Sequence, residues 1–265
     1  MLTRKIIEKI NYLHQKTFHS TKRNNDHRAI HMKIISWNCQ MALRKKLEPI
    51  QIQQPDIFVV PESEHPDKIN FEKYDLSCAE AVWVGDNLNK GLGIYSFSDM
   101  KLSLHESYTD KFRHIAPVTV TTDEEDFMLL AVWAMLCKED RNQRYIGQVY
   151  RALQYYQNLI DEKTIIIGDF NWNINFDKDK KTENFKDVVE LLKVHNIHSV
   201  YHHQNNEDMG QETFNTFYMH KNLEKGYHID YCFVSSGRLS ETKIEVKKYS
   251  VIKSVSDHTY LSIEF

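Results

Sequence analysis

From residue 32 onward, hydrophobic positions fall into short runs bounded by polar and turn-forming residues, a pattern that favours β-strands. Several of these runs alternate apolar and polar residues, and others are continuous, as in buried strands. The runs predict strands at 33–38, 56–62, 76–84, 92–97, 101–107, 116–121, 127–134, 164–169, 227–234, 243–250 and 260–265.

Apolar residues at helical spacing predict helices over 42–54, 141–160 and 182–195. The strand-rich stretch from 76 to 134 lies between the first two of them. Helical regions that flank a mostly antiparallel run favour two packed sheets covered by helices. The predicted fold class is therefore α/β.

Residues 2–18 place six large apolar side chains near helical spacing, with Lys and Arg between them. This pattern predicts a basic amphipathic helix, and the polar stretch 19–31 is typical of a linker. We therefore expect an N-terminal extension, 1–31, followed by one domain, 32–265. The helix either packs on the domain or on another copy of the chain, or serves as an arm that binds phosphate or a protein partner.

The composition of the 265 residues is that of a globular protein, with 41% hydrophobic and 27% charged residues. The longest apolar run, 128–136, is too short to span a bilayer, so we expect no transmembrane helix. Charge is unevenly distributed. Residues 1–31 carry seven basic and two acidic residues, which leaves 27 basic and 35 acidic residues in the remainder. An acidic body argues mildly against a broad nucleic-acid footprint.

The four cysteines do not have the spacing of a zinc finger or a redox motif. Three of them lie in or beside apolar runs, where buried free thiols are common. The first residues also lack an apolar signal-peptide region. These features predict a cytoplasmic location.

Polar side chains that suit metal and acid–base chemistry stand at the ends of several predicted strands. A rigid sheet can aim such side chains into one cleft. Carboxylate and amide oxygens suit Mg²⁺ or Mn²⁺ rather than zinc, and a histidine beside a carboxylate adds an acid–base group. The residues are Asn38, Glu62, Asp169, Asn171, Asp230, Asp257 and His258.

In order along residues 33–265, these segments resemble the endonuclease/exonuclease/phosphatase superfamily, which includes exonuclease III and deoxyribonuclease I. The motifs are Trp37-Asn38, Pro61-Glu62, Gly168-Asp169-Phe170-Asn171, His228-Ile229-Asp230-Tyr231 and Ser256-Asp257-His258. The resemblance implies a four-layer α-β-β-α sandwich of two packed mixed sheets. It also implies metal-dependent hydrolysis of a phosphate ester.

The resemblance further implies a role for each residue. Glu62 would be the principal metal ligand, with Asn38 beside it and Asp257 near or on the metal. Asp169 would orient or deprotonate the attacking water. Asn171 would position the phosphate, and Asp230 would be the partner of the essential His258.

Three positions depart from the family pattern. Trp133 stands where many relatives place a His or Tyr against the scissile phosphate, and indole cannot shuttle a proton. Either another residue, such as His202, His203 or Tyr150, fills that role, or it is absent. Gln40 replaces an acid or Asn of repair-type relatives, and His228 stands where they often hold Arg.

The segments 213–217 and 226–230 resemble the nucleoside pocket of abasic-site nucleases. Phe214 and Tyr227 would then stack on a base or a sugar, or else be ordinary core aromatics. The candidate substrate-binding residues are Trp133, Phe214, Tyr227 and His228.

We therefore expect a Mg²⁺- or Mn²⁺-dependent phosphodiesterase, a nuclease that cleaves DNA or RNA. Two alternatives stay open. One is a phosphatase or phosphodiesterase for a small-molecule or lipid phosphate, which the acidic body favours. The other is a catalytically weak relative that binds nucleic acid or protein within a larger assembly. The nuclease could itself be a component of such an assembly, with residues 1–31 as the docking element.

Overall fold

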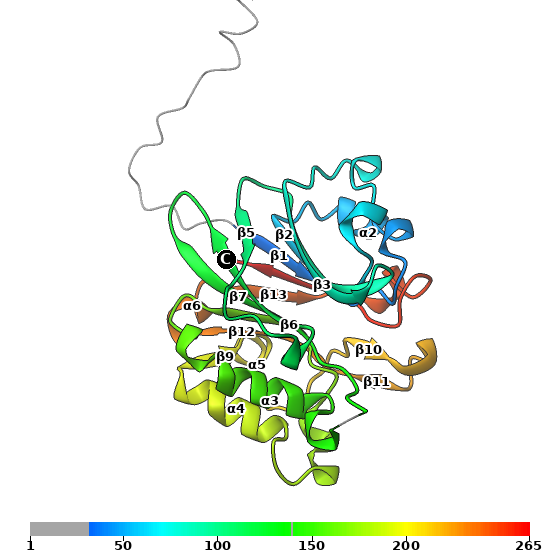
Figure 1. Ribbon diagram of the computed structural model, residues 1–265. Coiled ribbons are helices and arrows are strands. Elements are labelled where there is room, and N and C mark those ends of the chain that lie inside the picture. Colours follow the sequence, from blue (N-terminus) through cyan, green and yellow to red (C-terminus); the bar gives the residue numbers. More distant parts are fainter. Residues whose placement is uncertain (1–31, 139) are drawn as a thin grey trace, which may run out of the picture. The chain divides into compact units, whose positions relative to one another are not determined.

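A computed structural model describes residues 32–138 and 140–265 of the chain (Figure 1). The predicted amphipathic helix 2–18 and linker 19–31 lie outside these residues and stay predictions. Two sheets of six strands each form the centre of the described region. Every predicted strand has a counterpart there, although several are shorter.

The first sheet has the order β13-β14-β1-β2-β4-β3. Its two central strands, β1 and β2, are parallel, and all its other neighbours are antiparallel. Its strands are β1 (Lys33–Ser36), β2 (Ile57–Ser63), β3 (Glu80–Asn87), β4 (Lys90–Ser96), β13 (Lys243–Val246) and β14 (Leu261–Glu264).

The second sheet repeats this arrangement in the order β5-β6-β7-β8-β12-β9. Here β7 and β8 are the parallel central pair, and the other neighbours are antiparallel. Its strands are β5 (Lys101–Leu104), β6 (Ile115–Thr121), β7 (Asp126–Trp133), β8 (Ile165–Asp169), β9 (Ile197–Ser199) and β12 (Asp230–Ser235). A separate hairpin joins β10 (Phe217–Tyr218) and β11 (Gly226–Tyr227).

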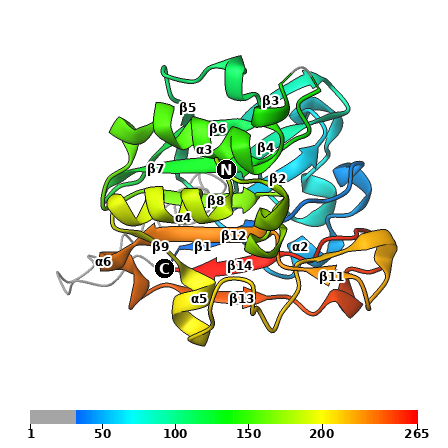
Figure 2. The ribbon, with the colours of Figure 1, turned by 90° about the horizontal axis from the view of Figure 1, so that it is seen from below.

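The helices cover the outer faces of the two sheets. Figure 2 shows α3 and α4 lying across the second sheet, where their apolar faces pack on residues such as Leu130 and Ile166. Short helical turns and loops cover the first sheet, where Leu43, Leu47 and Ile50 pack on Phe58. The predicted α-β-β-α sandwich is thus confirmed, with a thinner helical layer on the first sheet.

The helices are shorter than the sequence predicts. Over 42–54 the structure has only two short pieces, since Pro49 lacks the N–H of a helix interior and fits only a first turn. The α-helices are α2 (Glu48–Gln51), α3 (Ile146–Tyr155), α4 (Phe185–Val194), α5 (Val200–Asn205) and α6 (Ser236–Leu239). The 3-10 turns are η1 (Leu43–Lys45), η2 (Pro66–Lys68), η3 (Glu72–Tyr74), η4 (Asp110–Phe112), η5 (Arg141–Gln143), η6 (Gln157–Leu159), η7 (Ile174–Asp179), η8 (Met219–Lys221) and η9 (Tyr249–Val251).

Period-two alternation decides which side chains face the space between the sheets. In β8, Ile166 packs outward against α3 and α4, so Ile167 and Asp169 point to the opposite face. In β12, Tyr231 and Phe233 pack outward, so Asp230 also points inward. The same alternation in the first sheet leaves the inward faces of both sheets meeting in a buried, largely apolar layer.

Candidate active site

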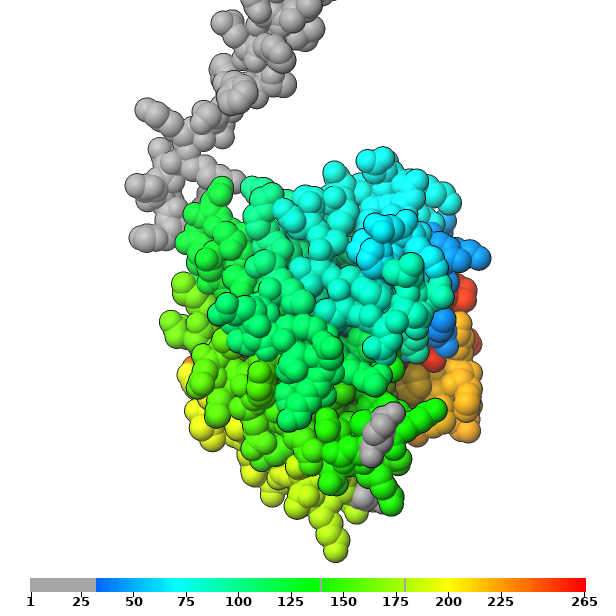
Figure 3. All heavy atoms as spheres, viewed as in Figure 1, coloured from blue at the N-terminus to red at the C-terminus, as the bar shows by residue number. Residues whose placement is uncertain are grey.

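The polar residues predicted at strand ends gather at one edge of the two sheets, called here the site edge. Strands β1 and β2 are parallel, as are β7 and β8, so the carboxyl ends of each pair lie together. Antiparallel β14 and β12 begin beside the ends of β1 and β8. Figure 3 shows the segments near residues 40, 220 and 255 meeting at the surface on this side.

Two buried side-chain hydrogen bonds hold the centre of the site together. The Asn38 amide Nδ2 donates to Asp169 Oδ2 over 3.0 Å, which joins the first sheet to the second. His258 Nδ1 lies 2.9 Å from Asp230 Oδ2. The other imidazole nitrogen, His258 Nε2, lies 4.0 Å from Asp169 Oδ2, too far for a hydrogen bond. An oxygen atom of water or substrate placed about 2.8 Å from each would fit between them.

The Asp169 carboxylate is fixed by its own backbone turn. Its Oδ1 accepts the N–H of Asn171 over 2.8 Å, and Asn171 has a left-handed backbone, φ 52°. Gly168 has φ 144°, and a Cβ there would lie 1.9 Å from the carbonyl oxygen of Val132. Glycine is therefore required for β8 to approach β7 this closely.

Burial and neighbouring charges perturb the two central groups. Complete burial raises the pKa of Asp169, and the Asp230 carboxylate raises it further, while His258, Asn38 and Asn171 act in the opposite direction. Burial lowers the pKa of His258, but the charges of Asp230 and Asp169 outweigh this effect and raise it to about 9. The site thus favours a protonated imidazole beside a carboxyl group that can exchange a proton near neutral pH.

Glu62 reaches the site edge through a backbone irregularity. Strict alternation along β2 would place it on the outer face with Phe58 and Val60. However, the register shifts between Pro61 and Ser63, and Glu62 has φ 63°, so it is the extra residue of a β-bulge. Bulges of this kind re-aim a side chain.

Asp257 lies beside the loop that follows β1. Its Oδ2 accepts the Gln40 amide over 2.9 Å, and the Gln40 backbone N–H donates to Asn38 Oδ1 over 3.0 Å. The Lys46 ammonium donates to the carbonyls of Cys39 and Gln40. Partial burial lowers the pKa of Lys46, while neighbouring charges that include Asp257 and Glu62 act in the opposite direction. Cys39 Sγ lies 3.6 Å from the Glu62 carbonyl oxygen, which places Glu62 beside the same loop.

The donors at the site edge fit a hard divalent cation. Glu62 and Asp257 offer carboxylate oxygens, and Asn38 offers an amide oxygen with one lone pair still free. Asp169, Asp230 and His258 form a second compact group, with ligand atoms within 4.8 Å of one another. Since hydrogen bonds already join His258 to Asp230 and Asn38 to Asp169, this group suits proton handling.

The residues predicted to bind substrate occupy different environments. Phe214 is half exposed, whereas Tyr227 is partly buried and packs on Phe176. Trp133 is 2% exposed, with its ring 4.6 Å from that of His114. His228 is also buried, 2% exposed, and its Nδ1 lies 2.7 Å from the carbonyl oxygen of Phe214.

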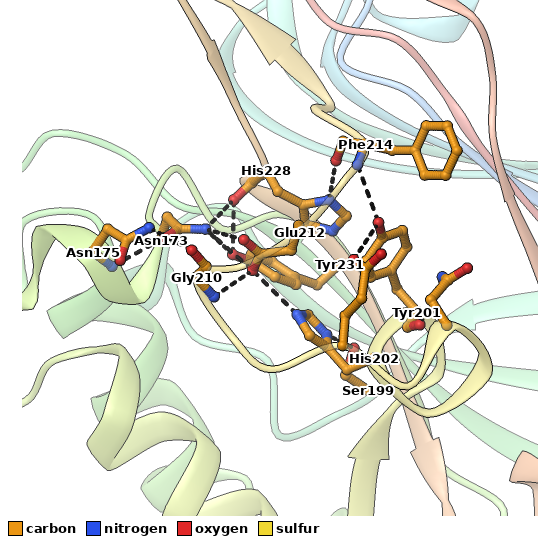
Figure 4. Close-up of polar contacts among 12 residues, drawn as sticks. Asn173, Asn175, Ser199, Tyr201, His202, Gly210, Glu212, Phe214, His228 and Tyr231 are labelled. Atoms are coloured by element: carbon orange, nitrogen blue, oxygen red, sulfur yellow. Dashed lines mark hydrogen bonds and ion pairs between the residues drawn. The ribbon is translucent and has the colours of Figure 1, made fainter.

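A buried polar cluster lies behind the site edge (Figure 4). Its centre is Glu212, whose Oε1 lies 3.1 Å from His202 Nε2 and also accepts the N–H of Gly210. Burial opposes ionisation of Glu212, but these hydrogen bonds outweigh it and lower its pKa to about 2. The Asn173 amide donates both to Glu212 and to the carbonyl of His228, which ties the β8 loop to the start of β12. His202 is therefore part of this cluster rather than an addition to the Asp169 group.

Two supporting residues lie in segments that the sequence singles out, although the sequence alone assigns them no role. The buried Thr216 hydroxyl accepts the N–H groups of Ile229 and Asp230, each over 3.0 Å. The Ser256 hydroxyl donates to the carbonyl of Asn38 over 2.8 Å and accepts the N–H of His258. Ser and Thr are common at surfaces and turns, so only the fold reveals that these two set the backbone around Asp230 and His258.

Residues 35–258 match the model of the Endonuclease/Exonuclease/phosphatase family. The chain belongs to this family. Members are typically phosphoesterase hydrolases that depend on a divalent metal. No curated protein matches the chain in sequence.

Solved structures of low sequence identity share the fold. A 3′ phosphatase, NExo, from Neisseria, bound to a product DNA hairpin, is 20% identical, with a TM-score of 0.63, over 88% of this chain and 99% of that one. An AP endonuclease from Archaeoglobus fulgidus is 16% identical, with a TM-score of 0.64 and the same two coverages. Truncated TDP2 from Caenorhabditis elegans is 14% identical, with a TM-score of 0.63, over 91% and 99%.

Among the described residues, none of the helices combines the length and the apolar character that crossing a membrane requires.

Proposed function

We propose that the protein is a divalent-metal-dependent phosphodiester hydrolase, and that it is a nuclease acting on DNA. The observation that carries the proposal is the convergence of Asp169, Asp230 and His258 at the site edge. Their ligand atoms lie within 4.8 Å of one another, although they come from three distant segments and both sheets. Membership of the family supports the reaction class.

Each group has a part in the proposed reaction. Asp169, held by Asn38 and the Asn171 N–H, orients the attacking water and accepts its proton. Asp230 holds His258 Nδ1, so that protonated Nε2 faces the phosphoryl group and offsets the charge that develops on its oxygens. Asn171, whose amide donates to the carbonyl of Ala134, positions the phosphate at the start of the β8 loop.

We propose that Glu62, Asp257 and Asn38 hold the metal, which is Mg²⁺ or Mn²⁺. When bound, a divalent ion neutralises phosphate charge and activates water. Glu62 is the residue whose substitution tests this assignment most directly, because Asn38 also donates to Asp169 and Asp257 also accepts the Gln40 amide.

Nucleic acid is the substrate that the structural neighbours favour, because the NExo structure contains DNA and another neighbour is an AP endonuclease. Exposed Phe214 would stack on a base, with Tyr227 and His228 behind it. The acidic body instead favours a small-molecule or lipid phosphate, so both substrate classes belong in the test. A cytoplasmic location, and a partner or self-association through residues 1–31, also stay predictions.

The test is hydrolysis of plasmid DNA, abasic DNA, RNA and bis(p-nitrophenyl) phosphate with Mg²⁺, with Mn²⁺ and with EDTA. We expect metal-dependent cleavage of the chromogenic diester and of DNA. Glu62→Gln should shift the metal titration midpoint to higher concentration, whereas the exposed Glu106→Gln should leave it unchanged. If the protein cleaves bis(p-nitrophenyl) phosphate but none of the nucleic acids, the substrate is instead a small-molecule or lipid phosphate. No cleavage of any phosphodiester would refute the proposal.

A further inference from the structure

Lys90 places a positive charge at the site edge, between the two sheets. It is the first residue of β4 and pairs with Asn87 across the turn from β3, next to the β2 bulge. Its ammonium Nζ lies 3.4 Å from Glu62 Oε2 and 5.1 Å from the centre of the Trp133 ring. The Lys90 side chain is about one-third exposed, so the ammonium can also meet a ligand.

The surroundings of Trp133 suit its indole ring to bind the Lys90 ammonium. The indole is buried at the end of β7 and braced by the His114 ring. The face of an indole attracts an ammonium group electrostatically, and tryptophan does so more strongly than other aromatic residues. Trp133 pairs with Asp169 in the register of β7 and β8, so it lies beside the carboxylate proposed to orient the attacking water. The indole ring has no proton to exchange, but the Lys90 ammonium that lies over it brings one positive charge to this position.

We propose that Lys90, seated on Trp133, is an anion-binding residue that holds a nonbridging oxygen of the substrate's phosphoryl group. This proposal rests on the proposed function. Glu62 is the metal ligand assigned above, and a carboxylate bound to a cation has less negative charge to offer Lys90. The three N–H donors of the ammonium are then available to the phosphate. His258, just before β14, and Lys90, at the start of β4, would approach the phosphoryl group as two separate positive charges.

The proposal predicts opposite effects on two measurements. Lys90→Met removes a competing cation from Glu62, so Mg²⁺ or Mn²⁺ should bind the protein as tightly as before or several-fold more tightly by calorimetry without substrate. The same change should lower kcat/KM for bis(p-nitrophenyl) phosphate by about tenfold to a hundredfold, the usual cost of losing a hydrogen bond to a charged group. Lys90→Arg should restore most of the activity.

The chain offers a matched control in Lys101, an exposed lysine of β5 that pairs with Glu80 over 3.0 Å. Lys101→Met removes the same kind of ion pair away from the site edge and should change neither measurement. Trp133→Phe should give an intermediate loss, because phenylalanine holds a cation less strongly. Thermal unfolding of each variant separates this loss from a damaged core.

Inorganic phosphate is the deciding probe, because its binding does not require turnover. With Mg²⁺ saturating, we expect phosphate to bind Lys90→Met at least tenfold more weakly than the parent protein or Lys101→Met. If the parent cleaves no phosphodiester but this difference is found, the proposed function fails and the anion-binding residue stands. Equal phosphate affinity in Lys90→Met and the parent would overturn the role of Lys90, whatever the activity.

Discussion

Asp230→Asn tests whether the Asp230–His258 pair works through charge. The substitution keeps the size of the side chain and leaves an oxygen that can still accept the His258 Nδ1–H. It removes the negative charge that contributes most to raising the pKa of His258 to about 9 against the effect of burial. Without it, the pKa of this imidazole should fall toward its ordinary value of about 6.5. The difference corresponds to roughly 3 kcal/mol of stabilisation of the imidazolium.

This change has a distinctive pH dependence. At pH 8 a histidine with a pKa of about 9 is roughly nine-tenths protonated, whereas one with a pKa of about 6.5 is roughly 3% protonated. The variant should therefore lose about 30-fold at pH 8 and much less at pH 6, where most of its His258 is charged again. The basic limb of its pH profile moves to lower pH, because the group must be protonated to act.

The assay is kcat/KM for bis(p-nitrophenyl) phosphate from pH 6 to 9 at saturating metal. Asp99→Asn, an exposed carboxylate in the turn between β4 and β5, is the matched control and should follow the parent profile. A loss that is equal at pH 6 and pH 8 would refute the electrostatic reasoning and leave Asp230 a purely orienting role. An unchanged profile would remove the pair from the reaction.

Three further changes test the scaffold. Gly168→Ala should destabilise the protein by more than about 2 kcal/mol in urea unfolding, since φ is 144° and the new Cβ would lie 1.9 Å from a carbonyl oxygen; stability within 0.5 kcal/mol of the parent would contradict this. Thr216→Val should cost about 2–4 kcal/mol, because the buried N–H groups of Ile229 and Asp230 lose their acceptor, whereas Thr216→Ser should retain most of the stability. Burial lowers the pKa of His114 to about 4. As the pH is lowered, the unfolded chain therefore binds this proton near pH 6.5, whereas the folded protein binds it only near pH 4, so the free energy of unfolding should decrease as the pH falls from 6.5 to 4. His114→Phe should flatten that part of the pH–stability curve, and an unchanged slope would show that His114 does not cause it.

The sequence predicts the centre of the site because strands have simple geometry. A short apolar run that ends in an acid places that acid at a sheet edge, and alternation then decides which face it takes. Asp169 follows this rule, since Ile166 packs outward and the acid points between the sheets. The pairing of β12 with β8 brings Asp230 opposite Asp169, but that register could not be predicted from single strands.

The rest of the site depends on irregular backbone. Glu62 faces the wrong side by alternation, and only the bulge in β2 redirects it. The predicted strand over 227–234 is divided in the structure, since β11 ends at Tyr227 and pairs with β10, while β12 begins at Asp230. No local pattern marks either break. The sequence could not single out Lys90 from the other lysines, because its partners Glu62 and Trp133 are distant in sequence.

The position of β14 in the first sheet has a consequence for biosynthesis. This strand lies between β13 and β1, and its start places His258 against Asp230. It is synthesised after every other strand of the two sheets. Strand β1 can therefore pair with β14 only after more than two hundred further residues have been made. A nascent chain that ends at β13 lacks His258, and its first sheet has a gap between β13 and β1 where β14 belongs. Assembly of the proposed catalytic group and closure of that gap therefore both depend on β14.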